Sequence, residues 1–211
     1  IRNQLTAAFS TLKAARNMRV KLLNYMKDFF DDQVDLNPRK SENIIFGKSK
    51  DKSTVYHLAD VLNNHKIKFN NISEDIIING NKYSKDNSYI IPMNQPKRTL
   101  IKGMFNTQTK FQDSLFYDVS AWTFPLAFNI NYDYTDGLSQ TNISKLIDNQ
   151  VDNLTKPNGF VDAKSEYAYI FEPHEYYTQA AIYKILDHGL RVKTATRKFS
   201  INGKKYDYGT Y

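Results

Sequence analysis

The stretch Asp60–Tyr83, DVLNNHKIKFNNISEDIIINGNKY, decides the fold because a second version, YKILDHGLRVKTATRKFSINGKKY, occupies Tyr183–Tyr206. A constant offset of 123 residues places the dipeptide Asn79-Gly80 over Asn202-Gly203. Asn-Gly is the strongest short signal for a β-hairpin, since both central residues of a type I′ turn need positive φ. We therefore predict one unit that occurs twice. The alternative is two unrelated units that share a common kind of turn.

The two copies extend beyond this stretch. Ile44-Ile45-Phe46 aligns with Tyr169-Ile170-Phe171 after a two-residue gap, and Tyr89 aligns with Tyr211 after one deletion. Each copy has the pattern of a strand, a helix, a second strand and a hairpin. Because a helical crossover normally joins parallel strands, we expect an α/β fold whose sheet is mainly parallel and has helices on both faces.

The copies cover about residues 42–92 and 166–211, and residues 93–165 link them. Within that link the spacing of apolar residues predicts helices over Gln95–Phe105 and Asn142–Leu154. A strand is predicted over Tyr167–Phe171, at the start of the second copy.

A long helix is predicted before the first copy. Apolar residues recur at steps of three and four between Asn3 and Asp32, the period of an amphipathic helix. Pro38 ends the pattern, because proline disfavours helical backbone at the residue before it. We divide the chain into residues 1–36, the long helix, and residues 37–211, an α/β accessory domain.

Charge and composition exclude several classes of protein. The net charge is +7, from 29 Lys and Arg against 22 Asp and Glu, but the basic residues are scattered as singles and pairs. Without a basic stripe that alternates with aromatic residues, we predict no nucleic-acid partner. No apolar run approaches the roughly 20 residues of a membrane helix, so no membrane span is predicted. The absence of Cys excludes disulfides, thiolate metal sites and a cysteine nucleophile.

The motifs of catalytic sites are also missing. None of the four His residues has His-x-x-Glu or His-Glu-x-x-His spacing, and there is no Gly-x-Ser-x-Gly pentapeptide. Gly47-Lys48-Ser49 lacks the earlier glycine of a phosphate-binding loop. His65 and His188 occupy the same position in the two copies, at a predicted helix C-terminus where an imidazolium favours the helix dipole. We predict no catalytic residue, metal ligand or cofactor in this chain.

The best local candidate for a polar site follows the predicted strand Tyr167–Phe171. In open α/β sheets, ligands bind beyond the carboxyl ends of the strands. The candidate ligand-binding residues are Glu172, His174 and Glu175, with Tyr176 and Tyr177 as stacking partners. The alternative is a solvated loop that caps the helix beginning near Thr178.

A second group combines aromatic residues with carboxylates in the link between the copies. It consists of Asp113, Tyr117, Asp118 and Trp122. Buried carboxylates need partners, so this group is either a capping network beneath the sheet or a docking surface.

Four segments carry a family resemblance: Ile1–Phe30, Tyr89–Pro96, Asp113–Pro125 and Tyr167–Tyr177. Together they resemble the region after the catalytic domain in large bacterial zinc carboxypeptidases, which are carboxypeptidase A-like metallopeptidases with a long C-terminal extension. The most specific string is Tyr-Asp-Val-Ser-Ala-Trp at 117–122. The resemblance covers essentially the whole chain.

The resemblance implies a division of labour within a longer polypeptide. The zinc ligands of that family, a His-x-x-Glu pair and a later His, and its general base Glu would all lie before Ile1. The zinc is therefore expected in the parent's catalytic domain, and the helix over residues 1–36 would be the last helix of that domain. The extension resembles a flavodoxin-like, class I glutamine amidotransferase-like domain, but that chemistry uses a Cys nucleophile, which this chain lacks.

We therefore expect a non-catalytic C-terminal accessory region of a zinc carboxypeptidase-like protein, whose parent removes C-terminal residues from peptides. It would support the upstream peptidase domain, docking through Phe116–Phe128, or position a peptide substrate. The resemblance also implies a periplasmic or secreted location. Because the chain begins at Ile1 and ends inside the second copy, we expect a fragment of a longer protein.

Two alternatives stay open. The first is an independent α/β module that binds a small ligand between the loops Gly47–Ser53 and Glu172–Thr178, which occupy equivalent positions in the two copies. The second is a degenerate enzyme, and the only argument for it is the analogy of the expected fold.

Overall fold

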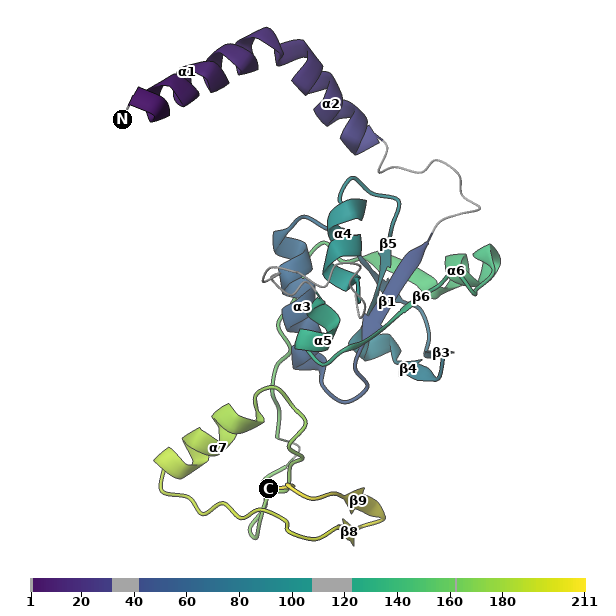
Figure 1. Cartoon of the computed structure of the whole chain (residues 1–211). Helices are drawn as coiled ribbons and strands as arrows, with labels where there is room; N and C mark the ends of the chain where they lie inside the picture. The colour runs from purple at the N-terminus through teal and green to yellow at the C-terminus, as the bar shows by residue number, and fades with distance from the viewer. Residues whose placement is uncertain (1, 32–41, 108–122, 162) are drawn as a thin grey trace, which may run out of the picture.

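The computed structural model describes residues 2–31, 42–107, 123–161 and 163–211, and its largest sheet has five strands (Figure 1). The strands lie in the order β6-β1-β5-β2-β7. Their bounds are Asn43–Gly47 for β1, Asn70–Ile72 for β2, Ser88–Pro92 for β5, Asn131–Tyr134 for β6 and Ile147–Gln150 for β7. The helices of this part are α3 (Lys52–Asn64), α4 (Arg98–Phe105), α5 (Phe124–Ala127) and α6 (Gln140–Leu146), with a 3-10 turn η2 (Lys85–Asn87).

The sheet is antiparallel, so the prediction of a mainly parallel sheet is wrong. Strands β1 and β2, joined by α3, do run in the same direction, but they are not neighbours. Strand β5 lies between them and runs the opposite way, with Tyr89 opposite Phe46 and Ile90 opposite Asn70. A hairpin, β3 (Ile76–Ile78) and β4 (Asn81–Tyr83), precedes β5 and returns the chain into this gap.

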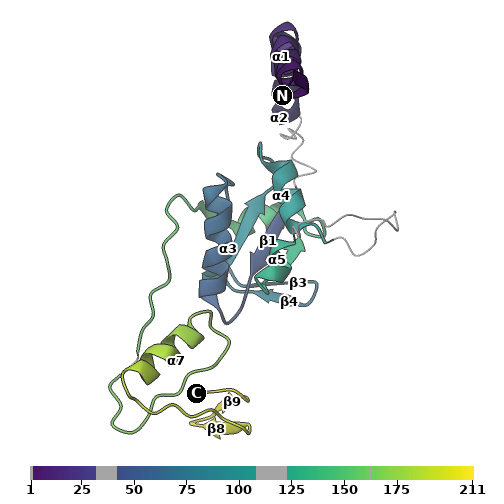
Figure 2. The ribbon, with the colours of Figure 1, turned by 60° about the vertical axis from the view of Figure 1, so that its left-hand side comes forward.

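Strand β1 is buried on both faces, and this burial explains why its sequence pattern predicted a parallel sheet. Ile44, Ile45 and Phe46 are all 0% exposed. One face packs against α3 and α4 in a cluster that includes Ile44 and Phe46, and Figure 2 shows these helices beside the sheet. On the other face Ile45 packs with residues of the hairpin and α6. An uninterrupted apolar strand is typical of parallel sheets because both of their faces are covered. Here the hairpin and α6 provide that cover for an antiparallel sheet.

Part of the second copy reproduces the first at the predicted offset. Helix α7 (Thr178–Asp187) ends 123 residues after α3, and His65 and His188 occupy the two C-cap positions. The hairpin β8 (Phe199–Ile201) and β9 (Lys204–Tyr206) matches β3 and β4. Asn79 has φ 49° and Asn202 has φ 50°, and a glycine with positive φ follows each. The local signals therefore produce the same helix end and the same turn twice.

The strands of the second copy do not form as predicted. Tyr167–Phe171 contains no strand, and neither do residues 193–195, the counterparts of β2. Two short pairings survive: Phe171 and Tyr211 exchange two backbone hydrogen bonds of 3.1 and 3.0 Å, and Ala195 donates to Thr210 at 2.7 Å and accepts from Gly209 at 3.0 Å. Phe171 and Tyr211 are the counterparts of Phe46 and Tyr89, which face each other in β1 and β5. A strand requires a ladder of partners, and the described residues provide Tyr167–Phe171 with a single pair.

Two further helix predictions differ from the structure. The single long N-terminal helix is divided into α1 (Arg2–Asn17) and α2 (Arg19–Asp31), which meet at a bend at Met18 (Figure 1). Asn17 is the weakest helix former near the bend. The helix predicted over Asn142–Leu154 ends at Leu146, and β7 follows because Ile147 pairs with Ile72 of β2. The predicted domain boundary at residues 36 and 37 lies outside the described residues.

The unequal burial of the two copies gives a matched test. Ile67 is 3% exposed and packs in the core, whereas its counterpart Leu190 is 61% exposed. We expect Ile67→Ala to lower the free energy of unfolding by about 2–5 kcal/mol, since it leaves a cavity. Leu190→Ala should change it by no more than about 0.5 kcal/mol. Urea denaturation of both variants measures the difference, and equal losses would contradict the burial described here.

Candidate functional site

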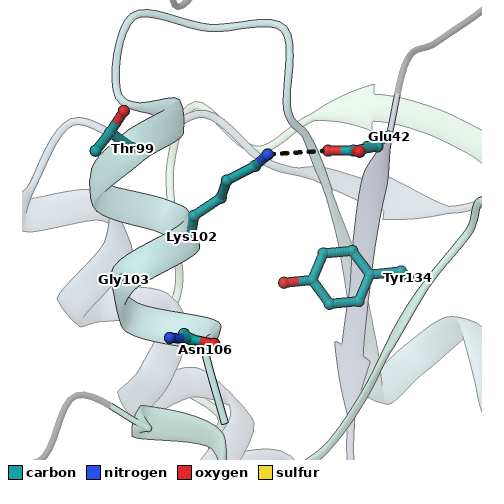
Figure 3. Close-up of a pocket in the computed structure, with 6 residues that line it drawn as sticks. All are labelled: Glu42, Thr99, Lys102, Gly103, Asn106 and Tyr134. Atoms are coloured by element: carbon teal, nitrogen blue, oxygen red, sulfur yellow. Dashed lines mark ion pairs between the residues drawn. The ribbon is translucent and has the colours of Figure 1, made fainter. Parts of the chain in front are cut away.

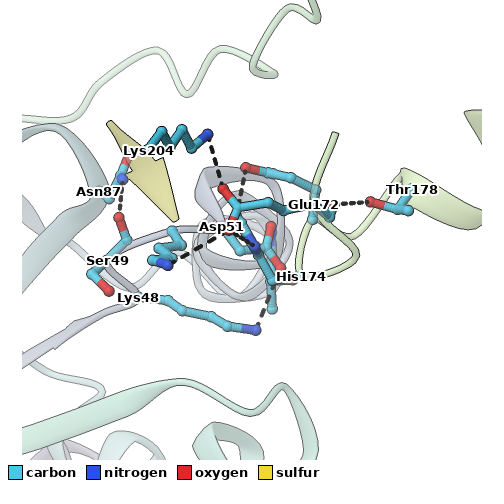
Figure 4. Close-up of polar contacts among 11 residues, drawn as sticks. Lys48, Ser49, Asp51, Asn87, Glu172, His174, Thr178 and Lys204 are labelled. Atoms are coloured by element: carbon cyan, nitrogen blue, oxygen red, sulfur yellow. Dashed lines mark hydrogen bonds and ion pairs between the residues drawn. The ribbon is translucent and has the colours of Figure 1, made fainter. Parts of the chain in front are cut away.

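Two polar loops, one from each copy, lie against each other. Residues 47–53 follow β1, and residues 172–178 precede and begin α7. Lys50 Nζ lies 3.8 Å from Glu172 Oε1, and the Tyr177 hydroxyl lies 2.9 Å from His57 Nε2 on α3. We call this set of contacts the inter-copy contact, and Figure 4 shows its polar part. The loops predicted to enclose a ligand are therefore neighbours in the structure.

The first loop is held closely against β5. A Cβ atom at Gly47 would lie 2.2 Å from Ser88 Oγ, so only glycine fits there without displacement. The Lys48 amide donates to the Asn87 carbonyl at 3.3 Å, and the Asn87 side chain donates to the Ser49 carbonyl at 3.2 Å (Figure 4). These bonds fix the direction in which the loop leaves the sheet.

Asp51 is the buried anchor of this loop, at 1% exposure. It caps the N-terminus of α3 by accepting hydrogen bonds from the Thr54 amide and the Thr54 hydroxyl. Lys48 Nζ lies 3.4 Å away. Burial alone would raise the pKa of Asp51, but hydrogen bonds from Thr54 and the Tyr176 backbone, together with the Lys48 charge, hold it below its ordinary value. Asp51 therefore contacts both loops as an ionised carboxylate.

Glu172 is the charged centre of the second loop. Its carboxylate lies 3.1 Å from Lys204 Nζ, 3.8 Å from Lys50 Nζ and 4.0 Å from His174 Nδ1. The hydrogen bond from Lys204 is the main reason why the pKa of Glu172 lies below its ordinary value. The backbone carbonyl of Glu172 also accepts from the Thr178 hydroxyl at 3.3 Å. Glu172 thus joins both loops and the hairpin of the second copy.

The pKa of Glu175 is shifted in the opposite direction, above its ordinary value. Burial raises its pKa, and the negative charge of Asp51 raises it further. Its carboxylate lies 3.8 Å from His174 Nε2. His174 therefore lies between two carboxylates whose pKa values are shifted in opposite directions, downward for Glu172 and upward for Glu175.

The predicted stacking residues do stack, but on a partner within the chain. The His57 ring lies 4.3 Å from the Tyr176 ring and 5.7 Å from the Tyr177 ring, measured between centroids. Lys156 Nζ lies over the Tyr177 ring at 4.8 Å from its centroid. The aromatic residues thus attach α7 to the middle of α3.

The side chains of the inter-copy contact bind one another and hold the two loops together. The carboxylates of this contact are paired with lysines, a histidine or backbone amides, so the charges largely neutralise one another. No group of three His, Cys, Asp or Glu side chains that could hold a metal occurs within residues 2–31, 42–107, 123–161 and 163–211.

The structure brings together all five predicted residues between Glu172 and Tyr177. The other predicted group, Asp113, Tyr117, Asp118 and Trp122, lies outside the described residues.

Sequence reasoning missed a pocket of about 600 Å³ between α4 and the sheet (Figure 3). It is lined by Glu42, Thr99, Lys102, Gly103, Asn106 and Tyr134. Glu42 pairs with Lys102 at 3.4 Å and with Arg98 at 3.3 Å. The spacing of Arg98 and Lys102, one helical turn apart, is the signal that could have indicated a shared acidic partner.

Comparison of the chain with protein-family models found no match, and searches of curated proteins and of solved structures found none either. Within the part of the chain that the structure describes, no helix has the length and apolar character needed to cross a membrane.

The pKa shifts predict that acid separates the two loops. Asp51 and Glu172 have lowered pKa values, so their stabilising contribution is complete above the ordinary carboxyl range and is lost as the pH falls below that range, through the lowered values. Glu175 acts with the opposite sign, since its raised pKa favours the protonated form. We expect the spin-label distance between Asn64→Cys and Asp187→Cys to broaden between neutral pH and about pH 2, which lies well below the ordinary carboxyl range.

Spin labels attach only at the two introduced cysteines, because the chain contains no native Cys. Far-UV circular dichroism must show that the helices survive at the acidic pH. Glu172→Gln at neutral pH should reproduce part of the broadening, whereas Glu175→Gln should not. A distance distribution that does not change with pH would show that these carboxylates do not hold the contact.

Proposed function

We propose that the chain is a non-catalytic accessory region of a carboxypeptidase A-like zinc carboxypeptidase, in which it supports the peptidase domain. The observation that carries the proposal is the exposed apolar face of the two N-terminal helices. None of the described residues of α1 or α2 is buried. The large apolar side chains exposed on α1 are Leu5 at 57%, Phe9 at 64% and Leu12 at 66%.

An amphipathic helix is stabilised mainly by the surface that its apolar stripe covers. α2 continues the exposed apolar surface with Leu22 and Met26, which are 47% and 53% exposed. Such a continuous patch is typical of an interaction site. A neighbouring domain of the same polypeptide would supply the missing partner, as the resemblance of Ile1–Phe30 to the end of a peptidase domain implies.

The chemistry of the described residues is consistent with an accessory role. The carboxylates of the inter-copy contact are paired with cations and hydrogen-bond donors, and the sequence contains no Cys nucleophile. The proposal therefore places zinc and the cleavage of C-terminal residues in the parent's catalytic domain. Positioning of peptide substrates and a periplasmic or secreted location belong to the same proposal, and both derive from the resemblance alone.

The test compares binding by the whole chain and two pairs of variants. We expect the chain to bind the catalytic domain of a bacterial zinc carboxypeptidase of this type, and Leu5→Glu with Leu12→Glu to weaken that binding at least tenfold. Ala7→Glu with Ala14→Glu introduces the same charges on the opposite side of α1 and should have little effect. Isothermal titration calorimetry measures all three.

Two results would contradict the proposal. One is equal binding, or no binding, by the wild-type chain and both double variants. The other is activity of the purified chain itself, with one bound zinc ion and release of C-terminal residues from a peptide.

A second candidate function is the binding of a small anionic ligand at the inter-copy contact. The observation that favours it is the convergence of Lys48, Lys50 and Lys204 where the two loops meet. Glu172 now neutralises two of these ammonium groups, so an anion would compete with its carboxylate. The candidate therefore predicts a ligand with several negative charges.

Thermal unfolding in the presence of citrate or tripolyphosphate tests this candidate. Ligand at 100 times its dissociation constant stabilises the folded state by about 2.7 kcal/mol, which raises the melting temperature by several degrees. Lys204→Gln should remove the shift, while Lys52→Gln, a change of an exposed lysine beside the first loop, should retain it. An equal shift in both variants would indicate a general effect of salt.

A further inference from the structure

The first copy recognises a carboxylate on an edge strand. Asp133 of β6 accepts hydrogen bonds from Asn79 Nδ2 and Asn81 Nδ2, both at 2.9 Å, and from the Tyr83 hydroxyl at 2.5 Å. Strand β6 pairs with the outer edge of β1, where Asp133 lies opposite Ile45. Three donors of the hairpin β3-β4 thus fix one strand of the sheet by its acidic side chain.

The second copy carries equivalent donors at the same offset. Asn202 corresponds to Asn79, Lys204 to Asn81 and Tyr206 to Tyr83. The two turns share the same positive φ, so the hairpin presents these positions in the same order. Lys204 replaces an amide with an ammonium group, which binds a carboxylate more strongly. The hairpin β8-β9 is therefore equipped for the same kind of acidic strand.

No described residue fills this place in the second copy. Neither the Asn202 amide nor the Tyr206 hydroxyl has a hydrogen-bond partner among the described residues. Ile170 and Ile201 are 39% and 44% exposed, whereas their first-copy counterparts are at 0% for Ile45 and 8% for Ile78. The exposed apolar side chains and the polar donors are both present, and no described carboxylate accepts from Asn202 or Tyr206 as Asp133 does from Asn79 and Tyr83.

We propose that the second copy binds an extended peptide segment of the β6 type, an Asp flanked by aromatic residues. The strand would add to the segment around Ile170, with its carboxylate among Asn202, Lys204 and Tyr206. The first copy identifies the occupant, because there the chain's own sequence Tyr132-Asp133-Tyr134 fills the equivalent place. Addition of a strand to a free edge is a common mode of peptide recognition.

One existing contact must change when such a segment binds. Lys204 now pairs with Glu172 at 3.1 Å, and the Lys204 side chain is 59% exposed. Because the Lys204 side chain is exposed, it can turn to an incoming carboxylate, and it then gives up its contact with Glu172. This proposal is independent of the proposed function, which depends on α1 and α2 and makes no use of the hairpin β8-β9.

The experiment uses a fluorescent peptide with the sequence of residues 129–135, Asn-Ile-Asn-Tyr-Asp-Tyr-Thr, titrated with the whole chain. We expect saturable binding by fluorescence anisotropy. Asp133→Asn in the peptide, and Asn202→Ala or Tyr206→Phe in the protein, should each weaken binding at least tenfold. Ser200→Ala, an exposed position on the same hairpin, is the matched control and should bind like the wild type.

A first-copy variant separates the two binding places. Asn79→Ala should leave peptide binding unchanged, because β6 of the chain already occupies that place. Loss of binding in Asn79→Ala but not in Asn202→Ala would show that the peptide exchanges with β6, and would overturn the proposal. No saturable binding, or binding that ignores Asp133→Asn, would overturn it as well. Tyr206→Phe retains the ring that stacks on Phe199, so the hairpin is kept in this test.

Discussion

Antiparallel pairing of β5 with β1 sets Tyr89 opposite Phe46 and leaves Ile90 and Ile91 at 0% exposure in the middle of the sheet. The other elements follow from this pairing. Helix α3 must cross over one face so that β2 can reach the free edge of β5, and the hairpin must then close the other face. Strand β6 takes the remaining edge of β1. The core is therefore one central pair of strands that is covered on both faces.

The same pairing explains why similar sequences give unequal copies. Phe171 and Tyr211 repeat the Phe46 and Tyr89 pair, and their rings stack at 5.6 Å between centroids. Around them the described residues include no counterpart of β6 or α6, and of the residues that match β2 only Ala195 makes backbone hydrogen bonds to the segment that ends at Tyr211. Helix α7 and the hairpin β8-β9 form nonetheless, because a helix end and a type I′ turn depend on local sequence. Burial depends on neighbours, so the counterparts of core residues remain exposed.

Features that depend on local sequence could be predicted, whereas features that depend on contacts between distant segments could not. The Asn79 and Asn202 turns, the ends of α3 and α7 at His65 and His188, and the apolar strands β1 and β5 were predictable from short patterns, whereas the strand predicted over Tyr167–Phe171 does not form. The direction of β5 was not, because an apolar run has the same appearance in a parallel strand and in an antiparallel strand covered on both faces. Ile147–Gln150 was misassigned to a helix for a related reason, since pairing with β2 outweighs a helical pattern.

For the candidate site, the position of Glu172 after an apolar segment indicated where polar groups would gather, and it does contact the other loop. Its partner Lys204 and the donors to Asp133 were not predictable, because they depend on how a hairpin packs across the sheet. That packing gives the hairpin two roles in one copy: Tyr83 closes the core with its ring and binds Asp133 with its hydroxyl. Burial and the bond to Asp133 both raise the pKa of Tyr83, so the hydroxyl stays a donor throughout the range in which the carboxylate is ionised. A hairpin with this geometry selects an acidic strand over a neutral one, since an apolar side chain opposite Ile45 would leave the three donors unsatisfied.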